Sequence, residues 1–183
     1  MNTANGLCLF FLVGLSKRQN LNLSMGGNFM RRGISFEIPN DYGRFLGDVL
    51  QPIEINAFHW KIGIGESYKT VNDKLDGMLF PDSQESISGT ELKTTLESND
   101  YYVIFADLQA YPSKEISSIE TYEEFMESDC ELVLLVVDCS YVTIYCKNQE
   151  AIISLQKNAL NNGFTDIEYI TDENDSRTRL SVW

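Results

Sequence analysis

The apolar run Leu132–Val137 constrains the fold of this chain more than any other stretch. Every residue of the run is Leu or Val, so a strand built from it is apolar on both faces, which is typical of the centre of a sheet. Residues 138–141 have the composition of a tight turn, and residues 142–146 continue as a second strand. The sequence therefore predicts a sheet with this pair of strands at its centre.

Short strands and short helices alternate along the rest of the chain. Strands are predicted where apolar and polar residues alternate, or where aromatic and β-branched residues are dense, at residues 33–38, 60–64, 68–71, 101–108, 167–170 and 179–183. Turns are predicted at 72–73 and 76–77, where Asn, Asp and Gly gather.

Helices are predicted from apolar spacing and from capping signals. Asn40 is a good N-cap for a helix whose apolar face consists of Tyr42, Phe45, Leu46 and Val49. Capping boxes at Ser88 and Thr121 begin two shorter helices, and the second is expected to turn Phe125 and Met126 inward.

A fourth helix is predicted over residues 150–161, with Gly163 in the C-cap position. Strands that are adjacent in sequence, with helices between them, favour an α+β fold. The length of 183 residues suits one domain. We expect a single α+β domain with a mixed or mostly antiparallel sheet and three to four short helices packed on it.

Residues 1–29 contain no Asp or Glu, so all 27 acidic residues follow them. Their apolar stretch 7–15 is too short to span a bilayer and lacks preceding basic residues, which disfavours a secretory signal. Residues 25–30 back-translate to a purine-rich stretch suited to a bacterial ribosome-binding site before a Met30 start codon. We expect 1–29 to be a mis-assigned start or a disordered leader, and 30–183 to be the globular domain.

The formal net charge is −13, which disfavours nucleic-acid and anionic-membrane binding because both depend on basic side chains. Seven acids and no base lie between Glu115 and Glu131. This cluster is either a solvated helix face or a docking surface for a basic protein partner. The candidate partner-binding residues are Glu120, Glu123, Glu124 and Glu127.

Metal and cofactor motifs are incomplete, so neither a metal nor a cofactor is predicted. His59 is the single histidine, and the four cysteines form no C-x-x-C pair. Gly63 and Gly65 lack the third glycine of a dinucleotide loop, and a β-bulge or close backbone approach explains them better.

Residues 172–176 resemble the start of a calcium loop. Arg177 and Trp183 stand where such a loop needs glycine and a bidentate acid. The sequence favours a polar turn whose acids are balanced by Arg177 and Arg179.

Asp107 and Asp138 adjoin apolar strands, where acids often lie in clefts. Together with Trp60 and Glu66 they form a candidate cleft, which would suit a small-molecule-binding protein or a hydrolytic enzyme. No complete catalytic arrangement accompanies them. The favoured hypothesis is a non-catalytic protein-binding or regulatory module that uses the acidic cluster, and the cleft is the alternative.

Four stretches resemble a family of short Bacillus-type proteins catalogued only as a domain of unknown function: RGISFEIPN at 32–40, YVIFADL at 102–108, DCELVLLVVD at 129–138 and YITDEND at 169–175. The resemblance spans residues 30–183. It implies one domain in a bacterial, cytoplasmic protein. It implies no activity, ligand or site residue.

Overall fold

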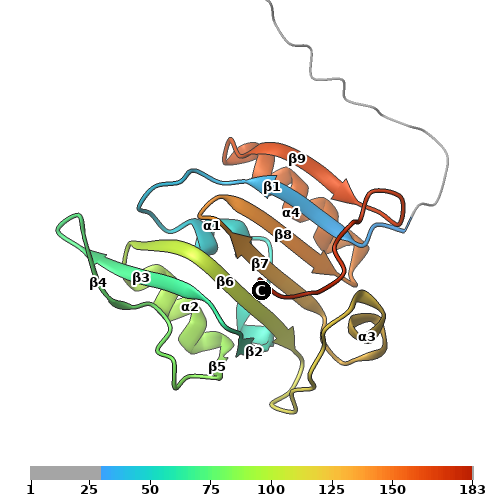
Figure 1. The fold of residues 1–183 in the computed structure, drawn as a ribbon, viewed down its shortest axis with the longest axis horizontal. Coiled ribbons are helices and arrows are strands. Elements are labelled where there is room, and N and C mark those ends of the chain that lie inside the picture. Colours follow the sequence, from blue (N-terminus) through green and yellow to red (C-terminus); the bar gives the residue numbers. More distant parts are fainter. Residues whose placement is uncertain (1–29, 183) are drawn as a thin grey trace, which may run out of the picture.

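The computed structural model describes residues 30–182, and the prediction made for residues 1–29 lies outside them. Within the described part, nine strands form one antiparallel sheet and four α-helices pack on it (Figure 1). The prediction of a single α+β domain is confirmed. No helix in these residues is long and apolar enough to cross a membrane.

The strands lie in the order β4-β3-β6-β7-β8-β1-β9, with β2 beside β6 and β5 beside β2. Their bounds are β1 Gly33–Glu37, β2 His59–Ile62, β3 Glu66–Val71, β4 Lys74–Met78, β5 Ser86–Ser88, β6 Tyr101–Tyr111, β7 Leu132–Val137, β8 Tyr141–Cys146 and β9 Thr165–Ile170. The helices are α1 Phe45–Leu50, the 3-10 turn η1 Ile55–Ala57, α2 Gly89–Ser98, α3 Tyr122–Glu127 and α4 Gln149–Asn161.

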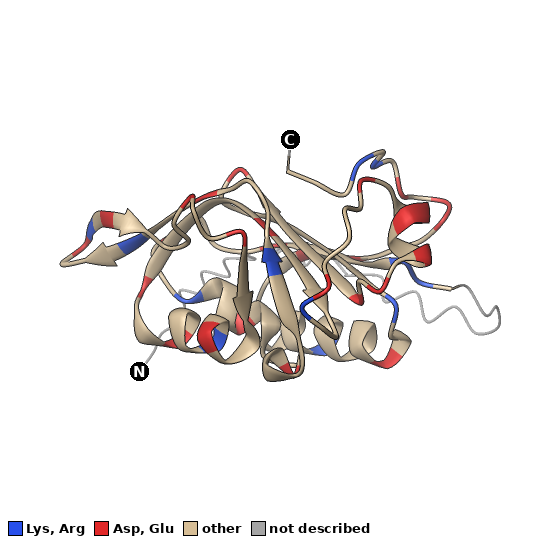
Figure 2. Cartoon of the chain, turned by 90° about the horizontal axis from the view of Figure 1, so that it is seen from below, with Lys and Arg blue, Asp and Glu red and all other residues tan. Residues whose placement is uncertain are grey.

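Both faces of the sheet carry an apolar core, and β7 contributes to each. Leu132, Leu134 and Val136 belong to the larger core, which α1, α2 and α4 cover. Val133 and Leu135 belong to the smaller core on the other face, which α3 and the segment after β9 cover (Figures 1 and 2). The central position predicted for this strand follows from its two apolar faces.

Helix α1 begins later than predicted, at Phe45, and Asn40 does not cap it. The backbone of Gly43 instead exchanges two hydrogen bonds with Tyr101 on β6, which holds the preceding residues extended. Asn40 accepts a hydrogen bond from the hydroxyl of Tyr102. Long-range backbone pairing has therefore overridden the local capping signal.

Two further predictions were wrong. Residues 76–77 lie inside β4, at a register shift against β3, so Asp-Gly marks a bulge and not a turn. Met126 is 41% exposed while Phe125 is fully buried, because adjacent helical residues point in different directions and α3 packs with one face.

The segment after β9 forms no strand within residues 179–182, contrary to prediction. It runs across the smaller core, where Leu180 is buried and its backbone N–H donates to the carbonyl of Glu120. Because the segment crosses a face of the sheet and does not join an edge, a ladder cannot form.

Candidate functional site

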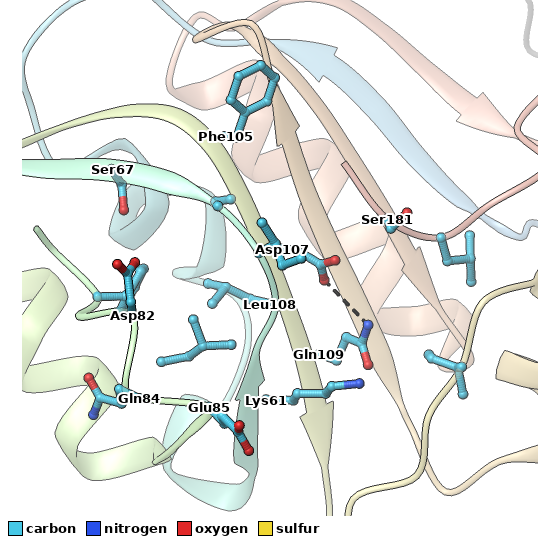
Figure 3. Close-up of a pocket in the computed structure, with 18 of the residues that line it drawn as sticks. Lys61, Ser67, Asp82, Gln84, Glu85, Phe105, Asp107, Leu108, Gln109 and Ser181 are labelled. Carbon is cyan, nitrogen blue, oxygen red and sulfur yellow. Dashed lines mark hydrogen bonds between the residues drawn. The ribbon is translucent and has the colours of Figure 1, made fainter. Parts of the chain in front are cut away.

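A cavity of about 770 Å³ lies where β2 and β3 meet beside β6 (Figure 3). This volume falls within the ~300–1,000 Å³ typical of small-molecule sites. Four segments supply most of its walls: 61–65 between the strands, 80–85 before β5, 105–109 of β6, and 179–181 of the C-terminal segment. Ser67 of β3 and Ile119, which precedes α3, complete the lining.

The cavity forms because β2 and β3 run consecutively along one side of β6 and part between Ile62 and Glu66. The N–H of Gly63 donates to the carbonyl of Asp107 at 2.8 Å. A Cβ atom on Gly63 would lie 2.6 Å from the carboxyl carbon of Asp107, and one on Gly65 would lie 2.8 Å from the carbonyl oxygen of Phe105. The interpretation of the two glycines as a close backbone approach is confirmed.

A bulge in β6 sets which side chains face the cavity. The register against β3 shifts between Glu66 and Ser67, which pair with Phe105 and Val103. Before the shift, the β6 side chains that belong to the larger core are those at positions 101 and 103. After it, they are those at positions 106, 108 and 110. The shift directs Asp107 and the residues two and four positions beyond it toward the opposite face.

The carboxyl of Asp107 is the central polar group of the cavity, and its residue is 6% exposed. Its hydrogen bond comes from the amide nitrogen of Gln109, at a long 3.4 Å. No ion pair includes it within the described residues. Burial raises the pKa of Asp107 to about 6, although the Gln109 hydrogen bond and the charges of Lys61 and Arg177 act in the opposite direction.

The side chain of Gln109 is itself positioned by the hydroxyl of Tyr111. The hydroxyl of Tyr111 lies 3.1 Å from the side-chain oxygen of Gln109 and 2.8 Å from the carbonyl of Ser117. Burial raises the pKa of Tyr111 to about 12, so the phenol stays neutral and can donate. Engaging the Gln109 oxygen leaves its amide nitrogen directed at Asp107, as Figure 3 shows.

Basic side chains gather near this carboxyl in an otherwise acidic protein. Lys61 lies opposite Gln109 in the register of β2 and β6, and Arg179 lines the cavity from the C-terminal segment. Arg177 donates to the carbonyl of Ser181 at 2.9 Å, which fixes the segment that carries Arg179. The wall formed by 80–85 supplies the acids Asp82 and Glu85 (Figure 3).

The structure places one of the four predicted cleft residues, Asp107, in the cavity wall. Trp60 is fully buried in the larger core and donates to the carbonyl of Ile55. Glu66 accepts from the hydroxyl of Tyr68. Asp138 lies in the β7–β8 turn with a φ of 49°. The four residues do not converge, so the predicted cleft reduces to its first member.

Sequence reasoning missed the other polar wall residues. Gln109 left a signal, because a buried amide within the apolar part of β6 requires a hydrogen-bonding partner. Lys61 and Arg179 left none, since each reaches the cavity through long-range pairing of its segment.

All four candidate partner-binding residues are exposed on or beside α3 (Figure 2, red bands at the upper right). Glu124 also has a structural role, because its carboxylate accepts from the backbone N–H groups of Glu120 and Thr121 in the capping box.

The acids of the calcium-like stretch are balanced by Arg32, and not by Arg177 and Arg179 as predicted. Arg32 lies 2.6 Å from a carboxylate oxygen of Asp172 and 3.0 Å from one of Asp175. Within residues 30–182, no group of three or more His, Cys, Asp or Glu side chains is placed to hold a metal ion.

The fold and the site thus define an antiparallel α+β domain with a ligand-sized cavity built around one buried carboxyl. Residues 31–181 match the family described as "Protein of unknown function (DUF2691)". The chain belongs to this family, as the resemblance in the sequence indicated. The chain is 49% identical over 154 residues to the "Uncharacterized protein YncE" of Bacillus subtilis (strain 168). These residues cover 84% of this chain and 100% of the relative. No solved structure matches.

Proposed function

We propose that the protein is a small-molecule-binding domain whose ligand occupies the cavity around Asp107. The observation that carries this proposal is the carboxyl of Asp107. It is nearly buried, it accepts one long hydrogen bond from the residues that the structure describes, and it faces a cavity of ligand size. Burying a carboxyl without adequate partners is costly, and a ligand that donates to it offsets that cost. Polar groups of this kind in a mostly apolar cavity are typical of binding sites.

A fragment titration followed by protein NMR tests this function. We expect a set of small polar and aromatic fragments to shift the backbone amide signals of residues 61–65 and 105–109, and the shifts to saturate in the millimolar range. The variant Asp138→Asn should show the same shifts as the parent protein, because this acid lies outside the cavity and Asn tolerates its positive φ. Shifts that spread over the surface, or that fail to saturate, would contradict the proposal.

A second candidate is a protein-docking surface, named here the acidic face and consisting of Glu120, Glu123, Glu124 and Glu127. None of the four forms an ion pair within the described residues. Met126 is exposed among them and supplies an apolar contact. Four unpaired carboxylates would attract a basic protein electrostatically, and Met126 would provide an apolar contact with it.

The salt dependence of protein capture tests the acidic face. We expect the immobilised domain to retain a basic protein from a bacterial lysate at low salt and to release it at high salt, because screening weakens exposed charge pairs. Glu123→Gln with Glu127→Gln should abolish the capture, whereas Glu54→Gln with Glu173→Gln, exposed acids elsewhere, should not. Capture that is indifferent to salt or to the first pair of substitutions would exclude this surface.

We also propose a cytoplasmic location. The thiols of Cys130, Cys139 and Cys146 are free. A reducing compartment keeps thiols in this state, so these residues favour the cytoplasm.

A further inference from the structure

We propose that the cavity binds a zwitterionic ligand of amino-acid type, with its ammonium group on Asp107 and its carboxylate on Lys61 and Arg179. This inference rests on the proposed function and adds the chemistry of the ligand.

The first step concerns Asp107, whose carboxylate receives one hydrogen bond from the side chains of the described residues, the long one from Gln109. Gly63 and Gln109 enclose it on two sides, so the remaining approach is from the cavity. An ammonium group brings several N–H donors and a compensating charge, and charge-assisted hydrogen bonds of this type are among the strong ones. A ligand amine therefore meets the need of this carboxyl better than a neutral group does.

The second step concerns Lys61 and Arg179, neither of which forms an ion pair within the described residues, although the charge of Lys61 acts on Asp107. Both line the cavity with Asp107, although the chain has 14 basic residues against 27 acidic ones. Two unpaired cations at one cavity form a receptor for an anionic group, and the guanidinium of Arg179 suits the two oxygens of a carboxylate.

The third step excludes ligands that carry a single charge. A simple cation would meet Lys61, Arg177 and Arg179 around its carboxylate partner. A simple anion would meet Asp107 together with the acids of the 80–85 wall. A ligand with both charges satisfies both sets, and the neutral phenol of Tyr111 disturbs neither.

The rest of the wall favours a ligand with an apolar side chain. Phe105, Ile119 and Leu180 line the cavity together with the charged residues. These side chains are contributed by β6, by the segment before α3 and by the C-terminal segment, so an apolar group would contact three parts of the fold at once. Amino acids with aromatic or aliphatic side chains combine all of these properties.

Three probes with the same phenyl ring separate the possibilities by calorimetric titration near neutral pH. L-phenylalanine carries both charges, 2-phenylethylamine lacks the carboxylate, and 3-phenylpropanoate lacks the amine. We expect L-phenylalanine to bind at least about tenfold more tightly than either single-charge probe, since each lost charge pair removes about 1.4 kcal/mol or more. Equal or tighter binding of the amine or of the acid overturns the inference.

Variants assign each charge to its partner. Asp107→Asn should reduce the affinity for L-phenylalanine to that for 3-phenylpropanoate, and Lys61→Gln with Arg179→Gln should reduce it to that for 2-phenylethylamine. Asp138→Asn should leave it unchanged. Unchanged affinity in the Asp107 variant overturns the inference. If the fragment titration still locates binding in the cavity, the proposed function survives that result, and if it does not, both fail.

Discussion

Replacing Asp107 by Asn is expected to stabilise the folded protein by roughly 2–3 kcal/mol above about pH 7, and to have little effect below about pH 4. The cause is burial, which raises the pKa of this carboxyl from 3.8 to about 6 in the folded state. Asn has a similar shape and carries no charge, so it removes the cost of burying the ionised form.

The sign of the pH dependence follows from the direction of the pKa shift. Between about pH 4 and pH 6, the folded state retains on Asp107 a proton that the unfolded state has released. The contribution of this group to stability is therefore lost as the pH rises through that window, and the penalty is complete above it. The Asn variant lacks this dependence.

Urea denaturation of both proteins across pH 4 to pH 8 measures the effect as a difference in unfolding free energy that grows with pH. An Asp107→Asn protein that is less stable than the parent at pH 8 would show that the carboxylate is well paired, and the ligand inference would lose its premise. The expected result would instead mean that Asp107 lowers the stability of the folded protein, which is typical of a group kept for binding.

The parts of the fold that could be predicted are those that local sequence determines. Leu132–Val137 has no polar face, so its central place follows from its own residues. The capping boxes at Ser88 and Thr121 form as predicted, because all their hydrogen bonds join residues within one turn. Where a distant backbone competes, as Tyr101 does for Gly43, the local signal fails.

The candidate site was predictable to a smaller degree. Asp107 could be found because an acid beside an apolar strand is unusual. Lys61 joins it through the pairing of β2 with β6, and Arg179 through the path of the C-terminal segment across the sheet. Neither relation is encoded near the residue concerned, so no local pattern could reveal the convergence.

The path of the C-terminal segment across the sheet depends on Arg32. Replacing this residue is expected to cause the largest loss of stability. Its guanidinium contacts Asp172 and Asp175 and lies 4.1 Å from the ring centre of Tyr122 on α3. The side chain of Asp175 is 3% exposed and also accepts from the hydroxyl of Tyr145 and from the N–H of Arg177. Arg32, the residue before β1, thus contacts both α3 and the segment after β9.

Arg32→Met is expected to lower the unfolding free energy by about 3 kcal/mol, the lower end for breaking a buried ion pair, because Asp175 retains two other hydrogen bonds. Urea denaturation measures the loss. The matched control is Arg44→Met, which breaks an exposed pair with Asp100 and should cost less than about 1 kcal/mol. Equal losses in the two variants would show that burial of the pair is without consequence.

Adding Asp175→Asn to Arg32→Met separates a charge effect from a packing effect. If the loss arises from an uncompensated buried carboxylate, the double variant should be more stable than Arg32→Met alone. A double variant that is no more stable assigns the loss to the contact with Tyr122. In either case the amide N–H of Leu180 should exchange faster in Arg32→Met, because its bond to the carbonyl of Glu120 lies in the segment that Arg32 anchors. Since Arg179 lines the cavity on that same segment, we expect the ion pair of Arg32 to maintain the wall that is proposed to bind the ligand carboxylate.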